Sequence, residues 1–91
     1  MQLSISNHAL VRYRERVFPQ ETCSDLDLRR NLVSSLKQTG VFDSLADIAQ
    51  GYNPPAYLKL KMETLQGIID LNFRKVAHLG RRYILTTIHA A

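Results

Sequence analysis

The sequence predicts an α+β fold in which two or three N-terminal helices pack on a three-stranded antiparallel β-meander. Apolar residues recur at helical spacing in the first half of the chain and alternate with polar residues in the second half. Between the halves, Asn53-Pro54-Pro55 ends the helical region, because two prolines cannot lie in a helix interior. The 91 residues are enough for one domain, residues 1–91, and leave no room for a second.

The first predicted helix runs from Asn7 to Val17. Ser6 is a suitable N-cap, no Gly or Pro interrupts the segment, and Pro19 ends it. At helical spacing, four apolar side chains share one arc: Ala9, Leu10, Tyr13 and Val17. The opposite side carries His8, Arg12, Glu15 and Arg16. We therefore expect an amphipathic helix whose polar face is rich in groups that bind phosphate.

A second helix is predicted from about Asp25 to Gln38, with Thr22 or Ser24 as its N-cap and Gly40 as its C-terminal stop. Its apolar stripe consists of Leu28, Leu32, Val33 and Leu36. Arg29 falls inside this stripe, so either its charged end reaches out to solvent or the helix begins later. Ser44 and Asp47 form another capping signature, which predicts a further short helical turn over Leu45–Gln50.

Two segments with period-two alternation predict strands, one around Leu58–Met62 and one around Ile69–Phe73. A third strand is predicted over Tyr83–His89, after a turn near His78-Leu79-Gly80. The short connections between the three strands imply an antiparallel meander. We expect the preceding helices to cover one of its faces.

The composition indicates a soluble protein with a basic surface. The formal net charge is +4, and eight of the twelve cations are Arg, whose planar fork binds phosphate better than Lys does. This balance is compatible with nucleic acid or with an acidic protein partner. The apolar runs are too short to span a membrane, and the first residues lack the order of a secretion signal. Since Cys23 is the single cysteine, we expect a reducing, cytoplasmic location.

The residue types exclude several kinds of site. His8, His78 and His89 are scattered and no cluster of carboxylates accompanies them, so we expect neither a metal nor another cofactor. No histidine stands in a sequence relation to Cys23 that would indicate nucleophilic catalysis, and no Gly-rich phosphate loop occurs. The polar face of the first helix is left as the candidate site.

Three tyrosines have two interpretations, and two lysines have an ordinary structural one. Tyr13, Tyr57 and Tyr83 could stack on bases, or they pack in or beside the core. Lys59 and Lys61 take outward positions on a strand, where they can protect a sheet edge from pairing.

The polar face of the first helix combines a proton carrier with two phosphate-binding groups. His8 and Arg12 are one turn apart, and Arg16 lies a further turn along. Histidine exchanges protons near neutral pH, and arginine stabilises the negative charge that develops on a phosphate under attack. The alternative is an ordinary solvated face in which Glu15 pairs with Arg12 or Arg16.

The ten residues His8-Ala9-Leu10-Val11-Arg12-Tyr13-Arg14-Glu15-Arg16-Val17 resemble the His-Ala-Leu-x-Arg-x-x-Glu-Arg-Gly/hydrophobic opening of a family of small helix-first proteins. This family is grouped with the RelE-like toxins in the barnase–EndoU–colicin–RelE ribonuclease superfamily. The last predicted strand is similar as well, with the Thr-rich apolar run Ile84–Ile88. Two features depart from the pattern: Val17 stands where Gly is typical, and residues 41–56 form a longer helical insert.

The resemblance implies RNA cleavage without a metal, by attack of a 2′-hydroxyl on the neighbouring phosphate. His8 would then be the general acid or base, Arg12 would hold the scissile phosphate, and Arg16 and Glu15 would complete or orient the cluster. Superfamily members often supply a further basic or hydroxyl group from the last two strands. The matching positions are Arg74, Lys75, Thr86 and Thr87. A one-residue slip in register inverts the face of each, so the choice among them stays open.

Two functions follow as hypotheses. The first is a metal-independent endoribonuclease, toxin-like in character, which would usually require an acidic antitoxin or immunity protein as its partner. The second is a non-catalytic RNA- or protein-binding module that keeps the ribonuclease-like fold, because a fold does not carry a function with it. A role as the antitoxin itself is disfavoured by the positive charge of the chain.

Overall fold

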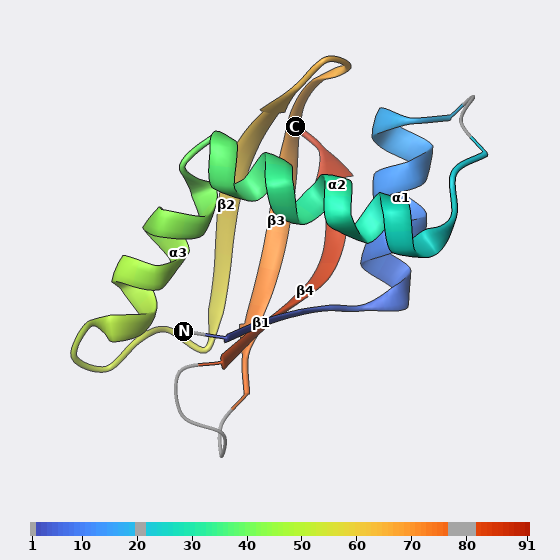
Figure 1. Ribbon diagram of the computed structural model, residues 1–91. Helices are drawn as coiled ribbons and strands as arrows, with labels where there is room; N and C mark the ends of the chain where they lie inside the picture. Colours follow the sequence, from blue (N-terminus) through green and yellow to red (C-terminus); the bar gives the residue numbers. More distant parts are fainter. Residues whose placement is uncertain (1, 20–21, 77–81) are drawn as a thin grey trace.

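A computed structural model describes residues 2–19, 22–76 and 82–91 of the chain (Figure 1). Within these ranges the elements in order are β1 (Gln2–Ile5), α1 (Asn7–Val17), α2 (Asp25–Gln38), α3 (Val41–Gln50), β2 (Tyr57–Thr64), β3 (Gly67–Lys75) and β4 (Arg82–Ala90). The α+β class predicted from the sequence is therefore confirmed. The turn predicted near His78-Leu79-Gly80 lies outside the described residues.

The prediction of a three-stranded antiparallel sheet is wrong, because the sheet has four strands in the order β1-β4-β3-β2 and is mixed. β2, β3 and β4 pair antiparallel in sequence, whereas β1 adds to the outer side of β4 in parallel, with Gln2 opposite Arg82 and Ile5 opposite Leu85. Four residues are too few to display an alternating pattern. This segment is a strand because it pairs with β4, which is distant in the sequence, so no local pattern indicated it.

α2 and α3 cover one face of the sheet (Figure 1). Alternate strand residues point into this layer and are buried there: Met62, Ile69, Leu71, Phe73, Tyr83, Leu85 and Ile88. The helices contribute Leu28, Leu32, Leu36, Val41, Leu45 and Ala49 to the same core. Among the described residues, neither of these two helices covers the opposite face, which we call the open face.

Ser6 joins β1 and α1 to β4. Its backbone N–H donates to Leu85 O (3.1 Å), which extends the β1–β4 ladder by one bond. Its Oγ accepts from the Ala9 N–H (3.0 Å) as the N-cap of α1 and donates to Thr86 O (3.0 Å). α1 therefore begins beside the middle of β4 and packs along the second half of that strand (Figure 1).

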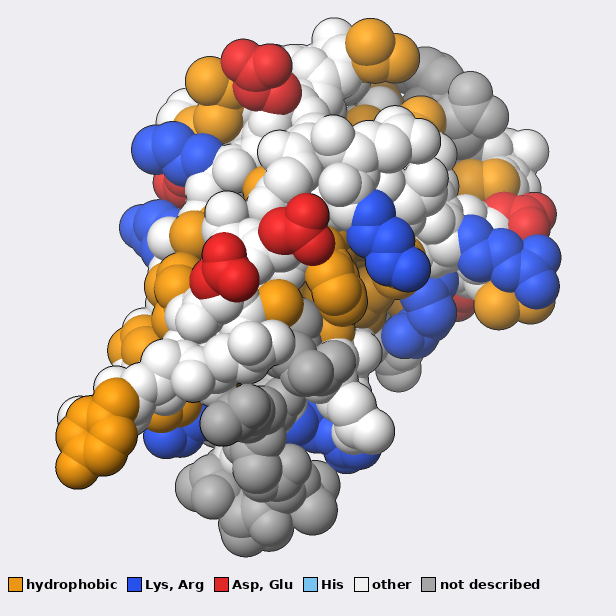
Figure 2. Space-filling model, turned by 60° about the vertical axis from the view of Figure 1, so that its left-hand side comes forward, with side chains coloured by type: hydrophobic (Ala, Val, Ile, Leu, Met, Phe, Trp, Pro, Cys, Tyr) orange, Lys and Arg blue, Asp and Glu red, His pale blue; other side chains and the backbone are white. Residues whose placement is uncertain are grey.

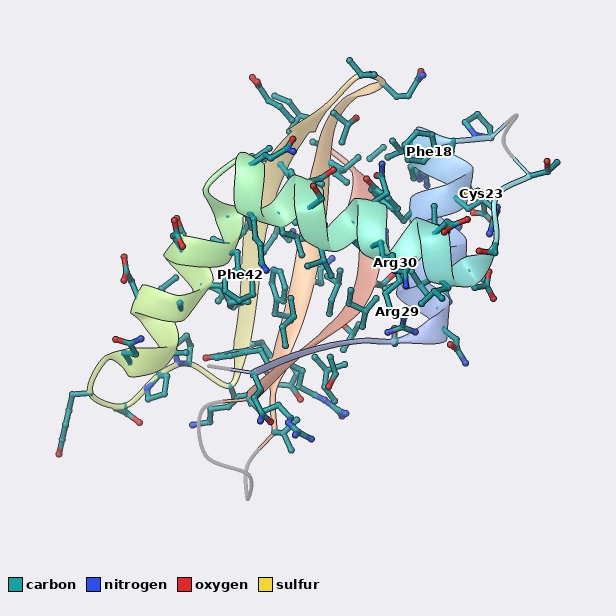
Figure 3. The ribbon with its side chains drawn as sticks, viewed as in Figure 1. Phe18, Cys23, Arg29, Arg30 and Phe42 are labelled. Atoms are coloured by element: carbon teal, nitrogen blue, oxygen red, sulfur yellow. The ribbon has the colours of Figure 1, made fainter. Side chains whose placement is uncertain are left out.

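α1 has the predicted bounds, and its predicted apolar arc is buried. The helix ends without glycine, since Phe18 is the C-cap and its N–H donates to Arg14 O (3.0 Å). Val17, at the position where the family has Gly, is buried in the core, and the Phe18 ring packs edge-on against Tyr13 (Figure 3).

α2 also has the predicted bounds, with Ser24 as its N-cap. Arg29 is half-buried, and its Nη1 donates to Ile5 O (3.3 Å), so its charged end meets the last carbonyl of β1 (Figure 3). Gly40 ends this helix as predicted, in the left-handed conformation (φ 82°) that suits glycine.

The predicted start of the third helix is wrong. α3 begins at Val41, directly after Gly40, and Ser44 lies inside the helix and forms no cap. The reason is burial: Val41, Leu45 and Ala49 recur every four residues and are all covered by the core. The burial of this arc outweighs the absence of a side-chain cap.

Two buried tyrosines connect the layers through their hydroxyl groups. The Tyr13 hydroxyl donates to Asn31 Oδ1 of α2 (2.7 Å), and the Tyr83 hydroxyl donates to Pro55 O before β2 (2.6 Å). Burial raises the pKa of Tyr13 above its ordinary value of 10.0, and a hydrogen bond with Ser35 offsets part of that rise. Burial also raises the pKa of Tyr83.

The Ser6 junction is tested by a pair of cap variants. Ser6→Ala should lower the free energy of unfolding by about 1.5–2.5 kcal/mol, since it loses both a helix cap and the bond to Thr86. Ser24→Ala removes only the cap bond to the Asp27 N–H and should cost about 1 kcal/mol. Urea denaturation of both variants measures the difference. Equal losses would contradict a special role for Ser6.

The tyrosines predict a loss of stability at alkaline pH. Each of these tyrosines keeps its hydroxyl proton in the folded state at pH values where the same tyrosine in the unfolded chain has lost it. The free energy of unfolding should therefore fall as the pH rises above about 10. Thermal melting across this range should show a smaller alkaline loss in Tyr13→Phe/Tyr83→Phe. Tyr52→Phe, which alters a fully exposed tyrosine, should keep the loss. If the double variant loses as much stability at alkaline pH as the wild type, the loss does not come from Tyr13 and Tyr83.

Candidate nucleic-acid interface

The strand register determines which side chains share the open face. Cross-strand pairs lie in three rows over β2, β3 and β4: Tyr57–Arg74–Ile84, Lys59–Asn72–Thr87 and Lys61–Asp70–His89. The third row contains an ion pair between Lys61 Nζ and Asp70 Oδ1 (3.0 Å). β2 lies at the sheet edge, as the outward lysines predicted, so this face ends on one side in Lys59 and Lys61.

A β-bulge in β4 places both predicted threonines on the open face. Leu85 pairs with Phe73 and Thr87 pairs with Asn72, so Thr86 has no residue opposite it. Leu85 and Ile88 are both fully buried beneath the helices, and the two threonines between them therefore project to the other side. Thr86 Oγ1 donates to Asn72 O (3.0 Å), which stabilises the bulge.

The centre of the open face carries two polar atoms without partners. Asn72 Nδ2 and Thr87 Oγ1 are buried and make no hydrogen bond within the described part of the chain. An unsatisfied buried polar group costs about 1–3 kcal/mol. Asn72 and Thr87 lie opposite each other across the two strands, so the sheet holds a polar row where apolar side chains would be more stable.

Of the two predicted cations at the end of β3, only Arg74 reaches the open face. It is exposed and lies beside Tyr57 in the first row. Lys75 points to the other side, where it lies opposite Tyr83 and its Nζ donates to Pro54 O (3.2 Å). The structure thus separates Lys75 from the other predicted strand residues.

The polar face of α1 is exposed at His8, Glu15 and Arg16. Arg12 Nη1 donates to Glu15 Oε2 (3.2 Å), which is the ordinary ion pair that the sequence offered as the alternative. The described residues provide His8 with no hydrogen-bond partner. Nothing observed in α1 alone therefore distinguishes a phosphate site from a solvated face.

The packing of α1 turns two of its arginines toward the open face. Arg14 Nη2 donates to Asp25 Oδ1 at the start of α2 (3.1 Å), so this flank of α1 faces the helical layer. Arg12 and Arg16 lie on the opposite flank by helical rotation. Since α1 packs beside β4, that flank adjoins the open face.

The position of Arg12 along β4 follows from the Ser6 junction. Ser6 lies level with Leu85 and Thr86, to which it is hydrogen-bonded. From there the helix rises about 9 Å to Arg12, and β4 rises about 10 Å to His89. Arg12 is therefore level with the third row of the open face.

The charge of the protein is unevenly distributed among its elements, although Arg14 of α1 and Lys75 of β3 face the helix-covered side. α2 and α3 carry three cations and four carboxylates, a net charge of −1. α1 and the four strands carry eight cations and three carboxylates, a net charge of +5. Seen from the side of α3, red and blue groups are interspersed (Figure 2). Positive charge therefore accumulates on the sheet and on α1.

Sequence reasoning missed several residues of this interface. Asn72 and Asp70 received no role, although their alternation with Ile69, Leu71 and Phe73 already marked them as outward-facing. Tyr57 is 75% exposed, whereas Tyr13 and Tyr83 are buried, so the three tyrosines do not share one role. The pairing of the strands, which the sequence leaves open, is what groups these residues.

Comparison with known proteins finds no match among protein-family models, curated proteins or solved structures. Across residues 2–19, 22–76 and 82–91, no helix is long and apolar enough to cross a membrane. The same residues contain no group of three or more His, Cys, Asp or Glu side chains arranged to hold a metal ion.

The polar row is tested by two valine substitutions one residue apart. Thr86→Val should lower the free energy of unfolding by about 0.5–1.5 kcal/mol, because it loses the bond to Asn72 O. Thr87→Val should raise it by about 1 kcal/mol, because the hydroxyl it removes is buried without a partner. Denaturant titration measures both. A comparable loss in Thr87→Val would mean that this hydroxyl is satisfied in solution.

Proposed function

We propose that the protein is a metal-independent endoribonuclease that binds RNA across the open face and along the adjoining flank of α1. The observation that carries this proposal is the excess of positive charge on α1 and the strands, +5 against −1 on α2 and α3. Of these cations, Arg14 and Lys75 are turned away from the open face. A surface of this kind attracts the phosphates of RNA, whatever their sequence.

The side chains of this surface supply the groups that RNA cleavage needs. His8 exchanges protons with the reacting hydroxyl groups, and Arg12 binds the scissile phosphate and stabilises its additional negative charge. The 2′-oxygen bonds to phosphorus while the bond from phosphorus to the 5′-oxygen breaks. The 2′-hydroxyl loses its proton and the 5′-oxygen gains one, which leaves a 2′,3′-cyclic phosphate and a 5′-hydroxyl.

The Arg12–Glu15 ion pair is compatible with phosphate binding. Exposed ion pairs contribute only about 0–1 kcal/mol, so a phosphate that accepts two bonds from the guanidinium can displace the carboxylate. Glu15 then serves to orient Arg12 before RNA binds. In this proposal Arg16 and Arg74 hold neighbouring phosphates of the RNA. Lys75 has no part because its ammonium group is bound on the other side of the sheet. The two threonines of the bulge shape the face without binding phosphate, because Thr86 Oγ1 donates to Asn72 O and Thr87 Oγ1 is buried.

A non-catalytic RNA-binding module is the second candidate, and one observation favours it. No described residue holds the His8 ring by a hydrogen bond, and a general acid or base is normally oriented by a neighbouring group. A module would use the same basic surface and would lack the chemistry.

The same surface indicates the class of protein that would restrain such an enzyme. An acidic antitoxin or immunity protein has the charge to cover α1 and the open face. Such a partner would exclude RNA from the site it occupies.

The proposal is tested by cleavage of labelled single-stranded RNA in excess chelator. The wild-type protein should produce cyclic phosphate ends. His8→Ala should slow cleavage by about 10²–10⁴-fold while RNA binding is retained. Arg12→Ala should slow it by about 10²–10³-fold and reduce the salt dependence of binding, because one phosphate contact is lost.

Arg30→Ala is the matched control, since this exposed arginine lies on α2, on the helix-covered side (Figure 3). It should cleave at the wild-type rate. RNA binding without cleavage in all proteins would favour the module. Cleavage that the chelator abolishes, or that both site variants retain in full, would overturn the proposal.

A further inference from the structure

A hollow of about 320 Å³ lies on the open face between its first two rows. Its lining consists of Tyr57, Leu58, Lys59, Asn72, Phe73 and Thr86. Leu58 and Phe73 are paired across the strands and point toward the helices, which leaves space above them on the open side. The volume is at the lower end of the range for small-molecule sites, so it suits one ring system rather than a length of polymer.

One wall of the hollow is the ring of Tyr57, which is not packed in the hydrophobic core. Tyr57 is 75% exposed, whereas Tyr13 and Tyr83 are buried with their hydroxyls hydrogen-bonded. Tyr57 lies in the row of Arg74, so an aromatic face and a guanidinium stand side by side on the two strands. Unpaired bases of single-stranded nucleic acid stack on side chains of this kind, because every base offers a flat face.

The opposite wall offers hydrogen-bonding groups at the level of a base edge. Asn72 lines the hollow and carries both a donor and an acceptor, and its Nδ2, which is buried in the unliganded protein, has no partner among the described residues. Thr86 adds a hydroxyl oxygen, which already donates to Asn72 O and is left as an acceptor. Lys59 and Arg74 lie on the two sides of the hollow, where the phosphates before and after a bound base would pass.

We propose that this hollow binds one unpaired nucleobase of RNA, stacked on Tyr57 with its edge toward Asn72. The inference rests on the proposed function, because it assigns a substrate class to the same face. A base in a duplex is stacked on both sides and paired along its edge, so it cannot enter the hollow. The protein therefore selects single-stranded RNA.

The test measures affinity for a labelled single strand and for a duplex of the same sequence, by fluorescence anisotropy in a His8→Ala background that prevents cleavage. Tyr57→Ala should weaken binding of the single strand by about 5–150-fold, the range for loss of one stacked base. Tyr57→Phe keeps the ring and should bind as before. The affinity for the duplex should be the same in all three proteins.

Tyr52→Ala is the matched control, because this tyrosine is also exposed but does not line the hollow. Its affinity for the single strand should be unchanged. If Tyr57→Ala weakens single strand and duplex equally, the hollow contributes only backbone contacts and the inference fails. If Tyr57→Ala binds normally while the wild type still cleaves RNA, the inference fails and the proposed function stands.

An NMR titration separates recognition of the base from recognition of phosphate. Uridine 5′-monophosphate should shift the Asn72 side-chain amide and the Tyr57 ring signals, whereas ribose 5-phosphate should shift only signals near Lys59 and Arg74. Identical shifts from both compounds would overturn the base site. If the wild-type protein binds neither RNA strand nor nucleotide, the proposed function itself is wrong.

Discussion

The arrangement of α1 against the sheet depends on the hydrogen bonds of Ser6. This residue ends β1, caps α1 and holds two successive carbonyls of β4, so one side chain and its backbone define the angle between three elements. Without the bond to Thr86, the helix would still be capped, but only the backbone bond to Leu85 O would tie Ser6 to the strand. The level of Arg12 beside the third row of the open face follows from this junction.

The bulge in β4 gives the open face its chemistry. A regular strand would direct only one of Thr86 and Thr87 to that face, and the other would meet the helices. With the extra residue, both hydroxyls lie on the open side while Leu85 and Ile88 remain in the core. The bulge and the Ser6 junction meet at Thr86, whose carbonyl binds Ser6 and whose hydroxyl binds Asn72. The β-bulge at Thr86 is therefore hydrogen-bonded both to the start of α1 and to β3.

The two sides of the sheet serve different physical purposes. The helix-covered side is apolar and closed, and its charges are nearly balanced. The open side keeps an unsatisfied polar row, an exposed aromatic ring and several exposed cations, each of which lowers the stability of the folded state. Features that oppose folding and gather on one surface are typical of surfaces that bind a ligand, since the ligand supplies the missing partners. We propose RNA as this ligand because its phosphates and aromatic bases match the cations and the exposed ring.

The elements whose signals are local could be predicted from the amino-acid sequence alone. The bounds of α1 and α2, the alternation in β2 and β3 and the stop at Gly40 all follow from neighbouring residues, because helix periodicity, caps and strand alternation act over a few positions. The start of α3, the strand nature of Gln2–Ile5, the common face of Thr86 and Thr87 and the exposure of Tyr57 were decided by tertiary structure. Each depends on contacts with residues far along the chain, such as the core beneath Val41 or β4 beside Gln2. A local sequence pattern does not specify those contacts.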